Sequence, residues 1–427
     1  DSGDTFTIPA GATINNQGTA VNFGATGSAS WVTTVKTGDF TAVAGEGYFV
    51  NTTGGEIDVT LPAGTAGDVV AISDYANNFA TANCILIQNG SDKVGGSAVN
   101  PTLSTNGVAV TLVFVDSTKG WIVTDSGNQT EAPTAQYITA TGGTPTTSPC
   151  GDYKIHTFTG PGALCVSCAG NATGSNTVDY LVVAGGGGGG KGEGTGGGGA
   201  GGYRESPGTA SGSYTVSPLG ASPAVALPVS VQPYTVTVGG GGAGGTPSQG
   251  PGVNGNLSTF SSITSTGGGF GAGGNEAGSS GGSGGGGGGR SSKAGGAGNT
   301  PPVSPAQGQN GGISTSGSSP CSVDAGGGGG GAIVAGGNAS NCNAASGGNG
   351  ATNSINGTPT ARAGGGGGES QAGSPTSGGT GGGGGGASTG NPGTINTGGG
   401  GGGGQPGGSG GGAGGSGIVI IRYKFQN

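Results

Sequence analysis

The run Gly-Gly-Gly-Gly-Gly-Gly at positions 185–190 opens the stretch that decides the fold of this chain. Similar runs follow at 196–199, 239–242, 284–289, 326–331, 364–368, 381–386 and 398–404. Of the 116 glycines in the chain, only 25 precede position 185. An apolar segment stands on each side, Val-Asp-Tyr-Leu-Val-Val at 178–183 and Ile-Val-Ile-Ile-Arg-Tyr at 418–423. The sequence therefore presents a glycine-rich stretch, 185–417, between two apolar strands.

Two structures are open to this stretch. Composition alone favours a flexible linker. Order is favoured by three features: nearly pure glycine runs, flanking strands that resemble two halves of a clamp, and Cys321 and Cys342, which are placed to form a disulfide. Polyglycine-II helices would suit these runs, because only glycine lets such helices pack closely enough for neighbours to bind each backbone N–H and C=O. We therefore expect an all-β chain with polyglycine II, in which a glycine-rich helix bundle is clamped between apolar β-strands.

Composition narrows the class of protein. The chain has 427 residues, of which 30% are hydrophobic and 7% are charged, so a large conventional core is not expected. The net charge is −8, yet the stretch 185–417 holds five acidic and five basic residues and is neutral. We expect no nucleic-acid partner and no membrane insertion, since there is no basic patch and no long apolar run. The chain opens on Asp1 without a signal peptide, which we interpret as a processed product or the end of a longer protein.

The remaining chain has the pattern of short β-strands. Residues 1–30 are interpreted as a connector, 31–128 as a compact β module (a sandwich or an intertwined oligomeric module), 129–184 as a linker and β clamp, and 418–427 as a closing strand. Within the module, apolar segments separated by turn residues predict strands at 47–51, 57–61, 69–73, 84–88, 108–115 and 121–124. Further strands are expected at 152–159 and 178–183.

Two parts of the sequence resemble bacteriophage tail-fibre proteins. The first is the series Gly-Tyr-Phe-Val-Asn-Thr-Thr-Gly-Gly at 47–55, Val-Thr-Leu-Pro at 59–62 and Lys-Gly-Trp at 119–121, which looks like a repeated module of these fibres. The second covers 140–425 and includes Asp-Tyr-Lys-Ile-His-Thr-Phe at 152–158 and Val-Asp-Tyr-Leu-Val-Val at 178–183. The resemblance implies a homotrimeric shaft and a receptor-binding tip in which glycine runs pack as polyglycine II.

No motif predicts catalysis. The segment 185–191 satisfies the phosphate-loop pattern, but Gly192 stands where Ser or Thr is needed and no helix can follow. Cys150, His156, Cys165 and Cys168 form a possible zinc set, although a disulfide among these three cysteines is favoured over a metal. Cys84 is interpreted as a buried free thiol. Asp58, Asp68, Asp74 and Asp92 are interpreted as solvated strand ends rather than a sugar-processing pair or a calcium site.

The loops between glycine runs are the best candidates for recognition, since loops on a rigid scaffold often bind partners. We predict that a tip formed by these loops binds a host receptor, with a plain turn as the alternative for each residue. The candidate residues are Pro301, Pro302, Asn310, Ile313, Asn353, Ile355, Asn391 and Ile395. The function expected is host attachment by a virion tail fibre, without a cofactor and alongside other fibre subunits. The alternatives are an extracellular structural or ice-binding protein and a tail-spike depolymerase.

Overall fold

The computed structural model describes residues 29–128, 135–172, 174–212, 214–246, 250–317, 322–371 and 374–426. The chain forms two compact units, 1–134 and 135–427, which are treated separately below. The predicted connector at 1–30 lies almost entirely outside the described residues. The predicted clamp, glycine stretch and closing strand all belong to the second unit.

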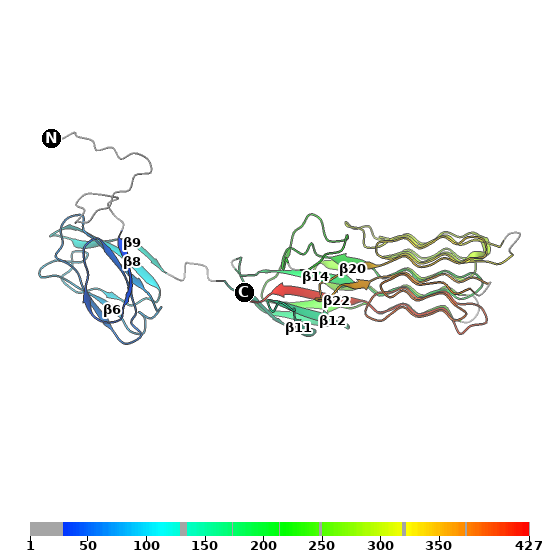
Figure 1. Cartoon of the computed structure of the whole chain (residues 1–427), viewed down its shortest axis with the longest axis horizontal. Helices are drawn as coiled ribbons and strands as arrows, with labels where there is room; N and C mark the ends of the chain where they lie inside the picture. Colours follow the sequence, from blue (N-terminus) through cyan, green and yellow to red (C-terminus); the bar gives the residue numbers. More distant parts are fainter. Residues whose placement is uncertain are drawn as a thin grey trace, which may run out of the picture. The chain divides into compact units, whose positions relative to one another are not determined.

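The first unit is a two-layered β structure (Figure 1). One sheet has the order β1-β3-β5-β8-β9 and the other the order β2-β4-β6-β7. The strands of the first sheet are β1 Ser30–Lys36, β3 Glu46–Val50, β5 Val69–Asp74, β8 Val108–Asp116 and β9 Gly120–Asn128. Those of the second are β2 Phe40–Thr41, β4 Ile57–Thr60, β6 Cys84–Ile87 and β7 Thr102–Leu103.

The first six strands of this unit follow a regular path between the two sheets. The first three strands of each sheet are parallel, and the strands β1 to β6 alternate between the two sheets. Each strand of one sheet thus serves as part of the crossover that a parallel pair in the other sheet requires. The core between the sheets includes Val59, Leu112 and Trp121, all fully buried. The six strands predicted for this module are confirmed, whereas β1 and the two-residue strands β2 and β7 were not anticipated.

The second unit begins with two sheets that share a core. One has the order β10-β13-β17-β18-β19, and the other the order β11-β12-β22-β14-β15, with β16 paired to β14. The first comprises β10 Ile138–Thr141, β13 Gly162–Ala169, β17 Pro233–Thr237, β18 Ser258–Phe260 and β19 Ile263–Ser265. The second comprises β11 Thr144–Thr147, β12 Tyr153–Phe158, β14 Thr177–Val183, β15 Tyr203–Glu205, β16 Leu227–Pro228 and β22 Ile418–Lys424.

Strands β14 and β22 are antiparallel partners, with Val183 opposite Ile418 and Asp179 opposite Arg422. The two apolar segments that flank the glycine stretch therefore meet, as the halves of a clamp would. Their sheet is buried on both faces, which explains why both strands are nearly continuous apolar runs. One face packs on the other sheet through residues such as Val182, and the opposite face packs on alanines of the glycine stretch through residues such as Leu181. A small hairpin, β20 Ala351–Asn353 and β21 Thr360–Arg362, completes this region.

The glycine segments extend side by side beyond this clamp (Figure 1). The run 185–190 is buried along its whole length. Its backbone groups form hydrogen bonds with other segments rather than with one another. Successive N–H groups donate to three neighbouring segments in turn. Every third N–H therefore donates to the same segment. The acceptors lie in 250–256, 412–415 and 196–199, and the carbonyls of the run accept from 242–245, 268–271 and 401–404. Every backbone polar group of the run is thereby bound without a hydrophobic core.

This packing requires glycine because the backbones touch directly. A Cβ atom built on Gly189 would lie 2.1 Å from the carbonyl oxygen of Gly402, and one on Gly187 would lie 2.2 Å from that of Gly269. Real Cβ atoms do not approach so closely. Alanine is accommodated at selected positions, such as Ala200 and Ala272, where its methyl group is fully buried.

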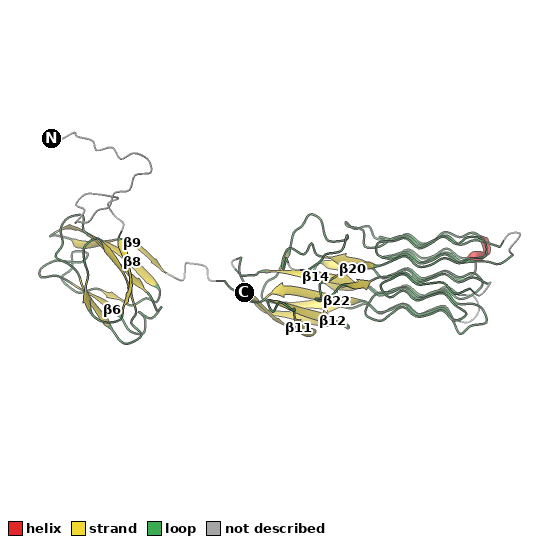
Figure 2. Cartoon of the chain, in the orientation of Figure 1, coloured by secondary structure: helices red, strands yellow, loops and turns green. Residues whose placement is uncertain are grey.

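The predicted glycine-rich helix bundle is wrong, whereas the all-β class is consistent with the structure. Among the described residues there is no α-helix, and the one helical element is the 3₁₀ turn η2 Gly289–Ser291. The glycine segments are drawn as loops rather than helices in Figure 2. The helical assignment is overturned because the described glycine runs form no helix; the hydrogen bonds between neighbouring segments, which the sequence also predicted, are present.

Candidate functional site

Each glycine segment runs between the clamp and the end of the second unit that lies farthest from it. The run 185–190 directly follows β14, so the turn after it lies farthest from the clamp. Backbone hydrogen bonds bring other turns to the same end; for example, Gly192 donates to Gly404 and Gly289 donates to Gly194. We call these the distal turns: 191–195, 273–277, 289–293, 340–344, 387–389 and 405–409. The clamp-side turns are 299–307, 332–335, 354–359 and 394–397.

Five of the eight predicted recognition residues lie at the clamp rather than at the distal end. Pro301 and Pro302 belong to a clamp-side turn that ends at Gln307, whose carbonyl oxygen accepts the Tyr203 N–H. Asn353 is buried and donates to Glu205 at 2.8 Å. Ile355 is fully buried in the cluster beside β14, and Ile395 is exposed on another clamp-side turn. These five residues therefore do not form a distal tip.

The other three predicted residues lie along the sides of the glycine segments. The side-chain oxygen of Asn310 accepts the Gly298 N–H at 2.8 Å. Ile313 is 47% exposed on the same segment. Asn391 shortly follows the distal turn 387–389, and its carbonyl oxygen accepts the Gly402 N–H. The structure thus does not bring the eight residues together as one surface.

The distal turns instead expose hydroxyl, amide and a few charged side chains. Among the described residues, no large exposed hydrophobic side chain belongs to a distal turn, while Ile333, Val334 and Ile395 are exposed on clamp-side turns. The exposed distal side chains include Asn275, Glu276, Arg290, Ser291, Asn341, Ser388, Thr389 and Ser409. The exposed apolar residues Ile333, Val334 and Ile395 therefore lie at the clamp end rather than the distal end.

Three distal turns meet in one polar cluster. Arg290 donates through Nε to Glu193 at 3.0 Å, and its Nη2 donates to the same carboxylate oxygen. Ser291 donates to the Asn275 side-chain oxygen at 2.6 Å, and the Arg290 N–H donates to Gly274. We call Glu193, Asn275, Arg290 and Ser291 the distal cluster. The sequence did not identify it, because Glu193 and Arg290 are 97 positions apart.

A buried carboxyl group lies behind this end of the unit. Glu369 is buried, and its N–H donates to the Thr195 carbonyl at 2.8 Å. Within the described residues neither side-chain oxygen makes a hydrogen bond of good geometry. Burial raises the pKa of Glu369 to about 7, although the Gln405 side chain and the N–H groups of Thr195 and Gly194 oppose this rise. Burial outweighs these contacts, because a charge without strong partners is costly in an enclosed site.

The charged groups of the clamp are structural. Asp179 accepts from Ser206 at 2.9 Å and from the Ser211 backbone at 2.8 Å. Glu205 accepts from Asn353 and from the Tyr203 hydroxyl at 3.0 Å. Both carboxylates are buried, and they hold the loop after β15 against the sheet.

His156 is part of the core rather than a metal ligand. Its Nδ1 lies 2.7 Å from the Gly142 carbonyl oxygen and must donate to it, so the neutral ring accepts from the Tyr423 hydroxyl at Nε2, 3.0 Å away. Burial lowers the pKa of His156. Both ring nitrogens therefore already have protein partners.

The cysteines depart in part from the predicted pairing. Cys150, Cys165 and Cys168 are free, so the predicted disulfide among them is wrong. Cys165 lies opposite Thr141 and Cys168 opposite Thr139, so the register shift between them places both side chains on the same face of the sheet. Cys342 is disulfide-bonded, while its predicted partner Cys321 lies outside the described residues. Cys84 is a buried free thiol as predicted, and burial raises its pKa to about 12.

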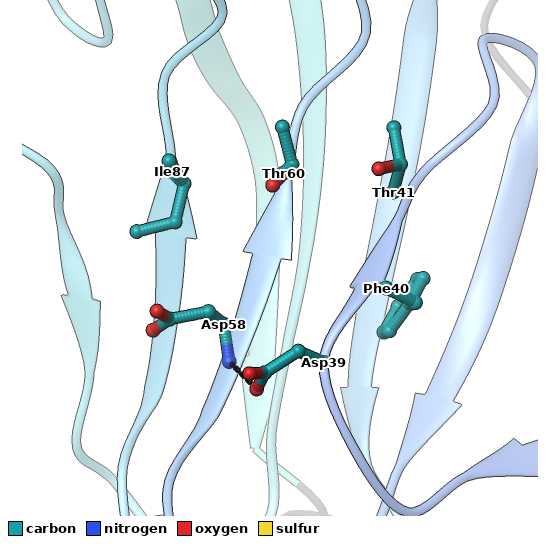
Figure 3. Close-up of a pocket in the computed structure, with 6 residues that line it drawn as sticks. All are labelled: Asp39, Phe40, Thr41, Asp58, Thr60 and Ile87. Carbon is teal, nitrogen blue, oxygen red and sulfur yellow. Dashed lines mark hydrogen bonds between the residues drawn. The ribbon is translucent and has the colours of Figure 1, made fainter.

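The first unit carries a groove of about 410 Å³ (Figure 3). Its lining residues are Asp39, Phe40, Thr41, Asp58, Thr60 and Ile87. Asp39 accepts the Asp58 N–H at 2.8 Å, the bond drawn as a dashed line. Among the described residues no group of three or more His, Cys, Asp or Glu side chains could hold a metal ion.

The four aspartates singled out in the sequence are separated. Asp74 is buried and accepts N–H groups from Asn78 and Gly107. Asp68 accepts from Thr65, and Asp92 accepts from Gly64. Each of these three residues therefore fixes a turn, and only Asp58 reaches the groove.

The phosphate-loop pattern at 185–191 has no structural counterpart. The N–H groups of Gly185 to Gly190 donate to neighbouring segments and are not free to bind phosphate. No helix in the described part of the chain is both long enough and apolar enough to cross a membrane.

Comparison with known proteins identifies the class to which the second unit belongs. Residues 167–424 match the glycine-rich domain family, and this match covers more than half of the chain. The chain is therefore a member of the glycine-rich domain family. No curated protein matches it.

Proposed function

We propose that this chain is a tail-fibre attachment protein whose distal turns bind a receptor on the host cell surface. The observation that carries this proposal is the set of exposed polar side chains on the distal turns, held by glycine segments whose backbones are hydrogen-bonded on several sides. Rigid presentation favours binding, because little conformational freedom is then lost on contact. The resemblance of both units to bacteriophage tail fibres supports the same conclusion.

The polar character of the distal turns favours many modest contacts over one apolar anchor. Such contacts gain strength when several copies bind together. The proposal therefore includes a homotrimer, several fibres on a virion, and no chemical step. Light scattering on the purified chain checks the trimer, and a monomer at micromolar concentration would contradict that part.

The attachment itself is tested with the whole fluorescently labelled chain on a panel of bacterial isolates. We expect strain-selective binding that falls when Ser388 and Thr389 on one distal turn are both replaced by Tyr. The matched control replaces Thr358 and Pro359 on a clamp-side turn with Tyr, and it should bind like the unmodified chain. Equal binding by the distal variant, or no binding to any isolate, would argue against the proposal.

A further inference from the structure

The distal cluster offers hydrogen bonds but little net charge. The guanidinium of Arg290 is paired with Glu193, so the two charges offset each other. Both side chains remain accessible, at 41% and 30% exposure. A strongly acidic ligand would meet Glu193, and a strongly basic ligand would meet Arg290. The electrostatics therefore favour a ligand without net charge.

Several polar atoms of the cluster remain available to such a ligand. Within the described residues, the Asn275 amide nitrogen, the second carboxylate oxygen of Glu193 and Nη1 of Arg290 have no hydrogen-bond partner. An amide nitrogen and a guanidinium only donate, whereas a carboxylate only accepts. A ligand that binds all three must both donate and accept at neighbouring atoms. Adjacent hydroxyl groups on a sugar ring have this property, because each hydroxyl can do both.

The absence of an apolar anchor among the described distal residues also favours an uncharged, hydroxyl-rich ligand. Protein partners usually bind through buried aromatic or arginine hot spots. Here no large hydrophobic side chain is exposed on the described distal turns, and Arg290 is already paired. We propose that the distal cluster binds neutral sugar units of a bacterial surface polysaccharide. This inference rests on the proposed attachment function and specifies its ligand.

The first test is binding of the whole chain to an array of neutral gluco-, galacto- and manno-oligosaccharides, with uronic-acid oligosaccharides alongside. We expect retention by at least one neutral oligosaccharide. Asn275→Ala and Glu193→Gln should each weaken that binding about tenfold, the effect of losing one or two hydrogen bonds. Thr358→Ala, on a clamp-side turn, should bind as the unmodified chain does. Melting temperatures of all variants show whether the fold is intact.

Failure of this inference can be separated from failure of the attachment function. Cells that bind the chain are treated either with periodate, which oxidises sugar rings, or with protease. Loss of binding after periodate alone is the expected result. Loss after protease alone would overturn the sugar ligand while leaving attachment in place. No retained neutral oligosaccharide, or unchanged binding by Asn275→Ala and Glu193→Gln, would also overturn it. Absence of binding to every untreated isolate would overturn both proposals.

Discussion

Gly189 shows what a single residue contributes in the interior of the glycine stretch. It is buried, its N–H donates to Gly412, and its carbonyl accepts from Gly245. These bonds hold three segments at backbone contact. The missing side chain is what allows that contact, since a Cβ at this position would overlap Gly402.

We expect Gly189→Ala to destabilise the second unit by about 1–3 kcal/mol or more, because overpacking at rigid backbone is poorly relieved. Gly407→Ala is the matched control, since a Cβ there would meet nothing within 4 Å. Thermal unfolding followed by circular dichroism measures both variants. Equal melting temperatures for the two would contradict the close packing of the central run.

Glu369 predicts a pH dependence of stability. Because burial raises its pKa in the folded chain from 4.5 to about 7, folding favours the protonated form. Its contribution to the free energy of unfolding is therefore fully present below about pH 4.5 and is lost as the pH rises through 7. Each unit of pKa difference corresponds to about 1.4 kcal/mol.

We accordingly expect Glu369→Gln to be less sensitive than the unmodified chain to a rise from about pH 5 to about pH 8. Denaturant unfolding at several pH values measures the difference. Glu276→Gln, which removes an exposed carboxylate from a distal turn, serves as the control and should keep the pH profile of the unmodified chain. A Glu369→Gln profile parallel to that of the unmodified chain would show that this residue ionises freely.

At the scale of the element, interior and outer glycine segments differ in how their backbone groups are bound. Interior segments have neighbours on all sides, whereas outer segments do not. Asparagine side chains substitute for some missing neighbours by accepting backbone N–H groups. Asn254 accepts from Phe270 at 2.8 Å, and Asn349 accepts from Thr380 at 3.0 Å.

Replacing Asn254 or Asn349 with Ala should lower the free energy of unfolding by about 1 kcal/mol, the usual net value of one hydrogen bond. Asn391→Ala is the control, since in the described part of the chain its exposed side chain makes no hydrogen bond. Guanidinium unfolding gives the three values. If Asn391→Ala is as destabilising as the other two, the lost hydrogen bond is not the cause.

At the scale of the whole molecule, the buried material differs from that of most proteins. Much of the second unit buries backbone amides rather than hydrocarbon, and only 30% of the chain is hydrophobic. Exposure of apolar surface raises the heat capacity on unfolding, whereas exposure of polar surface lowers it. The chain should therefore have a smaller heat-capacity change than an ordinary globular protein of its length.

We expect calorimetry of the whole chain to give less than about 12 cal/mol/K per residue, the lower end of the usual range. The stability curve should be correspondingly flat with temperature. A value within or above the usual range would show that apolar burial, rather than backbone packing, dominates the unfolding heat capacity.

Much of the fold followed from the sequence because its signals are local. Short apolar segments between turn residues predicted β4, β6 and β8, and continuous apolar runs predicted β14 and β22, where burial on both faces determines the pattern. Glycine runs indicated close backbone contact. The distal end was harder to identify, because some turns lie within glycine-rich sequence. Even at the clamp end, Gly381 and Gly382, with φ of 97° and 96°, turn the chain inside such a run.

The sequence by itself determined that the chain is all-β, that two apolar strands flank the glycine stretch, and that glycine is needed where backbones meet. Only the tertiary structure decided which segments are neighbours, which turns are distal, and that Glu193 meets Arg290. The physical reason is that the backbone bonds of these segments join distant residues, such as Gly187 and Gly401. Identical glycines carry no side-chain pattern that could specify such a partner in advance.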